Sequence, residues 1–443
     1  LATRPSLRAR VLLELAMCEE ELGRYELAAS ALTEALELAL SQPDWGLVQQ
    51  IATAAISVVG ARLGQPEAGL VYAELARGLL PPSGALHARS AIEHNLGHAL
   101  VAAERFADAS AAYRRAIDHD IARHGARHPE VATSRDALGS ALRELGDLPG
   151  AIAEARLALD IREDALGPRH RALVHSHDNL AIALAAQGEH TEAEAHVLAA
   201  IEIETRYTSR GADLAALHTE LGIVRAELGR SDEALAAFER ALQLTSEAFG
   251  PRDAHTAETM LNLAYVRQRG GDLERARTDI DAAIAILVEA RGPRHLSVAR
   301  AHGTRAGLLA SAGDLAGALA ADRTALAIKR ETLGDAHIDV ARSRTNVGET
   351  LVALGRWTEA IAELEQSVAV LASASAAPAA RAQASFALAR ALAGEGRDLR
   401  RAHGLAVAAR DALAGADGHD PERVAEIDAV IAEIGDRLGA RED

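Results

Sequence analysis

The sequence predicts an all-α fold, a right-handed superhelical solenoid of about ten helix pairs followed by a C-terminal capping helix. Three observations predict it: a repeat period near 42 residues, apolar residues at three- and four-residue steps, and the composition. Hydrophobic residues make up 49% of the 443 residues and aromatic residues only 2%. Such a composition favours helices, because Ala and Leu are strong helix formers whereas strands are rich in β-branched and aromatic side chains.

One position in each repeat, here called the anchor, is glycine in nine of its ten copies. Apolar residues recur with helical spacing on both sides of it, and glycine readily adopts the positive φ of a helix end. Each repeat therefore reads as two helices joined at the anchor, which predicts ten stacked pairs. The anchors follow one another at steps of 40 to 42 residues and are Gly23, Gly64, Glu104, Gly146, Gly188, Gly229, Gly271, Gly313, Gly355 and Gly396.

Residue size around the anchor predicts how the paired helices pack. The residues seven before and five after it are small in the first nine pairs, as at Ala16 and Ala28, so the helices are expected to approach closely. The residue eight before it is large and apolar in eight of the nine, beginning with Leu15, and Arg305 is the exception. These large residues are expected to fill the space between helices, and Cys18, close to Ala16, is expected to be buried.

This order of small, large apolar and turn positions resembles the tetratricopeptide repeat (TPR). The 42-residue period, with a segment such as 124–167 joining consecutive pairs, is similar to the repeats of kinesin light chain and its bacterial relatives. The resemblance covers about Ser6 to Ala414 and implies a docking scaffold for proteins or peptides.

Regularity along the chain predicts three segments. Residues 1–122 hold divergent pairs 1 to 3, residues 123–372 hold regular pairs 4 to 9, and residues 373–443 hold a degenerate tenth pair and the capping helix, expected over 420–439. A capping helix is what the terminal repeat of a stack needs in order to cover its apolar face.

The linkers between pairs carry a recurring glycine followed by Pro, Arg and His, as at 167–170 and 292–295. Glycine ends a helix, proline prevents its continuation, and a polar residue near the next start can cap it, so we interpret the motif as a helix boundary rather than a reactive loop. The linker 207–217 lacks it. The glycines are Gly125, Gly167, Gly250, Gly292 and Gly334.

Composition also argues against several function classes. The net charge of −17 and the few aromatic residues disfavour nucleic-acid binding. The lone Cys18 excludes an internal disulfide framework, and no apolar run is long enough to insert into a membrane, so a cytoplasmic location is expected. The sequence shows no catalytic motif, no cofactor loop and no recognised metal-ligand spacing, which predicts a chain with no cofactor that is not itself an enzyme.

The candidate binding surface is the face formed by the first helices of the pairs, here called the first-helix face, which lines the concave side of TPR arrays. Nine residues before the anchor, alternate pairs carry asparagine, whose amide can hold an extended peptide backbone; in kinesin light chain this position implies cargo contact. Arg300 and Arg342, thirteen before their anchors, are expected to set charge preference. Acidic residues expected on the same face favour a basic or mixed-charge peptide. The asparagines are Asn95, Asn179, Asn262 and Asn346, and the acids are Asp136, Asp178, Glu220 and Glu258.

Three functions stay open on the sequence alone. The first is a non-enzymatic peptide-binding scaffold. The second is a regulatory or docking tail of a bacterial signalling protein, such as a Ser/Thr kinase whose catalytic domain lies upstream of Leu1, or a transcriptional regulator; an arginine-rich composition with Lys329 as the single lysine is typical of GC-rich bacteria. The third is an enzyme built on His94, His98 or His175 with nearby acids.

Overall fold

The computed structural model describes residues 5–42, 44–207, 211–373, 378–414 and 421–439. These residues form helices and short connections, and no strand occurs among them. The predicted all-α class is confirmed. The handedness of the solenoid and the exact number of repeats stay predictions. None of the helices in the described ranges is long and apolar enough to cross a membrane.

Contacts divide the chain into two compact parts, residues 1–208 and 209–443, here called the N-terminal and C-terminal parts and described separately. The division falls in the connection between pairs 5 and 6, which lacks the glycine motif found between the other consecutive pairs from 3 to 9. The predicted linker 207–217 is helical from Gly211 onward. The three-segment division predicted from regularity is a different grouping and stays a prediction. The helices of the N-terminal part are α1 (Pro5–Glu21), α2 (Tyr25–Ser41), α3 (Trp45–Ala55), the π-helix η1 (Ile56–Arg62), α4 (Pro66–Gly78), α5 (Leu86–Ala102), α6 (Phe106–His124), α7 (Pro129–Leu145), α8 (Leu148–Leu166), α9 (Leu173–Gln187) and α10 (His190–Glu204).

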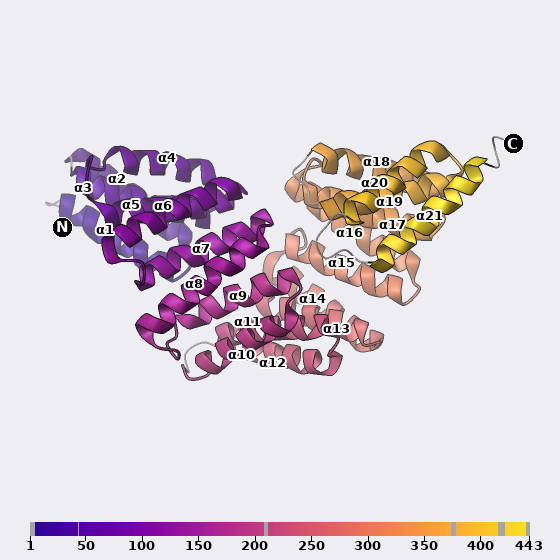
Figure 1. Cartoon of the computed structure of the whole chain (residues 1–443), viewed down its shortest axis with the longest axis horizontal. Coiled ribbons are helices and arrows are strands. Elements are labelled where there is room, and N and C mark those ends of the chain that lie inside the picture. Colours follow the sequence, from indigo (N-terminus) through magenta and orange to yellow (C-terminus); the bar gives the residue numbers. More distant parts are fainter. Residues whose placement is uncertain (1–4, 43, 208–210, 374–377, 415–420, 440–443) are drawn as a thin grey trace. The chain divides into compact units, whose positions relative to one another are not determined.

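In the C-terminal part, consecutive helices pack against each other in pairs, α11 on α12 and α15 on α16 for example, as Figure 1 shows. The helix α21 packs on α19 and α20 and buries Ile427 and Ile434, so it caps the last pair as the sequence predicted. The helices of this part are α11 (Gly211–Glu227), α12 (Ser231–Phe249), α13 (Ala254–Arg269), α14 (Leu273–Arg291), α15 (Leu296–Ser311), α16 (Leu315–Leu333), α17 (Ile338–Ala353), α18 (Trp357–Ser373), α19 (Pro378–Glu395), α20 (Leu399–Ala414) and α21 (Pro421–Gly439).

All ten predicted anchors lie between consecutive helices and have positive φ. Nine are glycines, for which this conformation is not strained. The remaining anchor, Glu104, adopts φ 57°, a conformation that is unfavourable for a residue with a side chain. The repeat frame therefore imposes the turn even where the sequence does not supply glycine.

The predicted small positions are where paired helices touch. A Cβ on Gly97 would lie 2.4 Å from the Tyr113 ring, and one on Gly222 would lie 2.7 Å from Phe238. The small residues after the anchor, such as Ala109 and Ala234, are fully buried. Close approach of the two helices of a pair thus requires the absence of a side chain, as expected.

The first helix departs from the predicted packing. The large apolar residue eight before the anchor is buried in seven pairs, for example at Leu138 and Leu180, but Leu15 is 46% exposed. Cys18 is exposed as well. Both expectations of burial were wrong for the same reason: no helix of the described chain packs on that side of α1, whereas in later pairs the preceding pair does.

The glycine motifs are helix boundaries, as predicted. All five glycines have φ between 81° and 100° and ψ between 155° and 160°, a conformation open almost only to glycine. The His that follows caps the next helix, since the Nδ1 atoms of His128, His295 and His337 accept backbone N–H groups at 3.0 to 3.2 Å. The histidines of the motif are therefore occupied in ending and starting helices.

Candidate functional site

The four asparagines nine residues before the anchor are the only asparagines in the chain, and each lies on a first helix. Asn95 on α5 and Asn179 on α9 are half-buried in the N-terminal part, whereas Asn262 on α13 and Asn346 on α17 are exposed in the C-terminal part. The surroundings of these asparagines differ.

Asn95 lines two adjoining cavities. The larger, about 500 Å³, is bounded by first helices α1, α3 and α5 with η1, and it presents Glu14 and Glu20 beside Leu13. The smaller, about 220 Å³, adds Asp120 from α6 and Glu130 from α7. The Asn95 amide donates to the Thr53 carbonyl at 2.9 Å, which leaves its own carbonyl oxygen to accept from a ligand.

Asn179 has no comparable space, because the cavity that it lines holds only about 10 Å³. Its amide interacts with the Asp136 carboxylate, which is also bound by the buried Arg162 and, at 3.1 Å, by the Ser176 hydroxyl. Asp136 is thus ion-paired within the chain and is not exposed to a ligand. Asp136 lies at a buried position on α7, and Arg162 on α8 forms an ion pair with it, so this acid belongs to the interior of the fold.

Asn346 lines a cavity of about 300 Å³ formed by α15, α16 and α17. Two glycines of α15, Gly303 and Gly307, make up one wall, and the carboxylates of Asp322 and Glu349 lie in the same cavity. Burial raises the pKa of both carboxylates above their ordinary values. This cavity combines an amide, space and two acids that resist ionisation.

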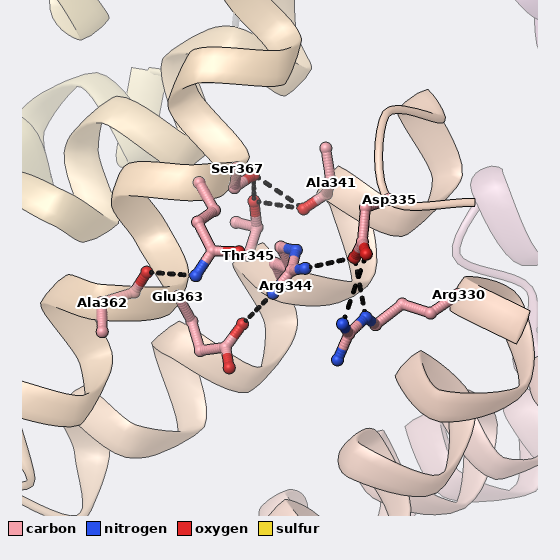
Figure 2. A network of polar contacts seen from close by, with 9 residues as sticks. Arg330, Asp335, Ala341, Arg344, Thr345, Ala362, Glu363 and Ser367 are labelled. Carbon is pink, nitrogen blue, oxygen red and sulfur yellow. Dashed lines mark hydrogen bonds and ion pairs between the residues drawn. The ribbon is translucent and has the colours of Figure 1, made fainter.

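The helix that carries Asn346 is fixed by a buried arginine on the same helix. Figure 2 shows Arg344 between Asp335 of the preceding linker and Glu363 of α18, to which it donates at 2.6 Å each. The hydroxyls of Thr345 and Ser367 lie 2.8 Å apart in the same network. Because these bonds join α17 to the linker and to α18, they set the position of the Asn346 side chain.

The predicted charged residues of the site form ion pairs within the chain. Arg300 lies 3.5 Å from Glu258, and Arg342 lies 3.6 Å from Asp339 on its own helix. Both arginines are largely exposed, so solvent weakens these pairs and a ligand anion can compete for them. Glu220 is half-buried on α11. Arg342 and Asn346 are four residues apart on one face of α17.

The histidines considered for an enzyme site fall into separate environments. His94 and His98 lie with their Nε2 atoms 3.1 Å apart, and His98 Nδ1 is 3.1 Å from the Tyr113 hydroxyl. Burial lowers the pKa of His98 to about 4 and also lowers that of His94. His175 is exposed on α9. A buried neutral histidine pair is a packing arrangement, and the three histidines do not converge.

Three possible metal ligands lie close together where α6 ends and α7 begins. They are His124, His128 and Glu130, and their ligand atoms lie within 4.8 Å of one another. The two imidazole rings stack at 4.0 Å with only 11° between their planes, so no ion can lie in both planes as coordination requires. His128 Nδ1 also accepts the Glu130 N–H. This group fits a helix boundary and not a metal centre.

Sequence reasoning missed Asp322, Gly303 and Gly307. The sequence does contain a signal for Asp322. Nine residues after the anchor, all nine other pairs have an apolar or aromatic residue, and Asp322 is the single charged residue at this position. A charge at a core position of a repeat is the type of conflict that marks a site.

Comparison with known proteins gives the family. Models described as tetratricopeptide repeat match residues 9–42, 88–164, 138–205, 213–287, 256–331 and 297–373, together more than half of the chain. The chain belongs to the tetratricopeptide repeat family. No curated protein matches it in sequence.

Solved structures share the fold. A Rap protein complexed with Competence and Sporulation Factor has a TM-score of 0.53 at 16% identity, covering 83% of this chain and 98% of that one. Yeast Tom70 has a TM-score of 0.53 at 14% identity, covering 98% and 97%. A putative kinesin light chain of Podosopora anserina has a TM-score of 0.41 at 19% identity, covering 44% and 93%. At these identities the likeness concerns the fold, and the family assignment rests on the repeat models.

Proposed function

We propose that the chain is a non-enzymatic scaffold that captures an extended peptide segment on its first-helix face. The observation that carries this proposal is that all four asparagines of the chain occupy one repeat position on that face, and two of them, Asn95 and Asn346, line cavities large enough for side chains. Amides suit the task, since each offers a donor and an acceptor to a peptide backbone.

The roles of the site residues follow from their surroundings. In the N-terminal part Asn95 contacts a ligand backbone, while Asn179 contributes less because Asp136 engages it. In the C-terminal part Asn346 contacts a ligand backbone, with Asn262 as a further exposed amide. Arg300 and Arg342 exchange their internal partners for an acidic group of the ligand, and Glu220 contacts a basic one. A Rap protein of this fold has been solved with Competence and Sporulation Factor, which is compatible with ligand capture by such a scaffold.

The test is selection of binders from a random nonapeptide library, followed by fluorescence anisotropy with the selected peptides. Asn95→Ala should weaken binding of the peptides held by the N-terminal part, and Asn346→Ala binding of those held by the C-terminal part, each about tenfold or more, since a hydrogen-bonding partner that the bound peptide buries is lost. Gln243→Ala, an exposed amide on the second helix α12, is the matched control. Unchanged affinity in the Asn95→Ala, Asn346→Ala double variant would exclude the first-helix face.

A second candidate keeps the same scaffold within a larger bacterial signalling protein, as the docking or regulatory tail of a Ser/Thr kinase. The arginine bias, with Lys329 as the single lysine, favours this context. We expect such a signalling protein to be cytoplasmic. The reading frame upstream of Leu1 tests it, because a kinase tail must follow a glycine-rich loop and the HRD and DFG elements in frame.

A further inference from the structure

Asp322 occupies a position that the repeat otherwise reserves for the core. It lies on the second helix α16, nine residues after its anchor. In eight of the other nine pairs the residue at this position is buried, and in the last pair it is partly buried beside the hydrophobic core. Its residues there are Leu32, Ala73, Tyr113, Ala155, Val197, Phe238, Ile280, Leu364 and Leu405.

Asp322 is buried without a cation. Its exposed fraction is 6%, and its Oδ2 atom accepts the Thr350 hydroxyl at 2.8 Å. No arginine, lysine or histidine of the described residues forms an ion pair with it. A buried carboxylate with one neutral hydrogen bond is unfavourable, because desolvation is not repaid by an opposite charge. The position therefore lacks its natural counter-ion.

The space beside Asp322 is opened by missing side chains. Gly303 and Gly307 lie four residues apart on one side of α15, and a Cβ on either would meet no atom within 4 Å. Neither glycine has a positive φ or a close neighbour that requires it. Glycine is disfavoured inside helices, so two of them facing one cavity of about 300 Å³ mark space kept open for a ligand.

A second carboxylate strengthens the negative field of this cavity. Glu349 on α17 accepts from the Gln383 amide at 3.0 Å and lies 3.8 Å from Arg423, a distance at which the charge is only partly compensated. Burial is the main cause that raises the pKa of Glu349, and the nearby Asp322 carboxylate adds a smaller increase. A cation between them would relieve both the repulsion and the desolvation.

We propose that the cavity between α15, α16 and α17 is a specificity pocket for one basic side chain, lysine or arginine, of the peptide held on the first-helix face. Asp322 is the counter-ion at the base of the pocket, Glu349 is the second carboxylate, and Asn346 holds the peptide backbone at the entrance. The volume is at the lower limit of the about 300–1,000 Å³ found for small-ligand pockets, which suits a single side chain. This inference rests on the proposed function.

The experiment is parallel selection of the random nonapeptide library by the wild-type chain and by Asp322→Asn. The wild type should enrich lysine or arginine at one peptide position, and Asp322→Asn should select peptides without that preference. In anisotropy titrations, replacing the enriched basic residue by norleucine should lower wild-type affinity at least about tenfold and leave Asp322→Asn affinity unchanged. Norleucine keeps the length of lysine and removes only the charge.

Three further variants separate the pocket from general effects. Asp322→Leu installs a residue that three other pairs carry and should also lose the basic preference. Gly307→Leu should block the space while leaving Asp322 in place. Asp232→Asn, an exposed acid on α12, is the control and should select as the wild type does. A thermal unfolding curve for each variant shows that it is folded.

The outcomes distinguish the two proposals. If wild type and Asp322→Asn select the same peptides, or if the selected peptides share no basic position, the pocket is excluded while peptide capture stands. If the wild type enriches no peptide at all, both proposals fail. A basic preference that survives Gly307→Leu would likewise place cation recognition elsewhere.

Discussion

Two buried charges on neighbouring helices of the C-terminal part have opposite environments. Arg344 on α17 is 4% exposed and bridges two carboxylates, Asp335 and Glu363, at 2.6 Å each. Asp322 on α16 is 6% exposed and has one neutral hydroxyl as its partner. The first charge joins three segments of the chain through ion pairs, whereas the second joins α16 to α17 through one neutral hydrogen bond. Burial alone thus does not tell a structural charge from a functional one; the partners do.

The largest expected effect comes from removing the paired charge. Arg344→Met should lower the free energy of unfolding by about 3 kcal/mol, since its loss leaves Glu363 without its cation and removes the bonds that join α17 to the linker and to α18. Equilibrium urea unfolding measures it. The control is Arg330→Met, because Arg330 also binds Asp335 but is exposed, and its loss should cost below about 1 kcal/mol. Equal losses for the two variants would make the bridging role of Arg344 wrong.

A third way to bury a titratable group is to keep it neutral, as at His98. Burial lowers the pKa of His98 from 6.5 to about 4. Below pH 6.5, His98 is therefore protonated in the unfolded chain but stays neutral in the folded chain until the pH approaches 4. The stability contributed by the neutral ring is complete above pH 6.5 and is lost as pH falls toward 4, by up to about 3 kcal/mol. Urea unfolding at pH 7 and pH 4.5 should show this fall in the wild type and a smaller one in His98→Gln. An equal fall in both would assign the pH dependence to other groups.

Removing the unpaired charge should have the opposite sign to removing Arg344. Asp322→Leu is expected to raise the free energy of unfolding by about 2 kcal/mol at pH 7, because an uncompensated buried carboxylate is replaced by an apolar side chain. Burial raises the pKa of Asp322 above the ordinary 3.8, so the wild type loses stability as pH rises through that elevated pKa. The advantage of Asp322→Leu should therefore be larger at pH 7 than at pH 4. A loss of stability in this variant would show that Asp322 supports the fold.

The contrast also explains what the sequence could predict. Helix pairs, turns and close packing follow from local sequence rules that recur in each repeat. The close contact of Gly97 with Tyr113 and the helix caps at His295 and His337 could therefore be predicted. Which polar groups face each other across helices is not a local property. Asp136 looks like a groove acid on its own helix, and only the position of Arg162 on the next helix shows that it is buried. The cavity beside Asp322 likewise depends on Gly303 and Gly307, which lie on the preceding helix.

The smallest expected effect tests whether every departure from the repeat pattern signals a site. Glu104 is an anchor without glycine; its side chain is exposed, its φ is 57°, and it lines neither cavity beside Asn95. Glu104→Gly should stabilise the chain by about 1 kcal/mol, since a left-handed conformation is costly for a residue with a Cβ, and binding of the selected peptides should not change. Gly146→Ala, at an anchor with φ 87°, should destabilise by a similar amount for the same reason. Thermal unfolding of both variants measures the pair. If Glu104→Gly gains stability without affecting binding while Asp322→Leu gains stability and loses the basic preference, then a broken pattern indicates function only where it also opens a space and leaves a charge without its partner.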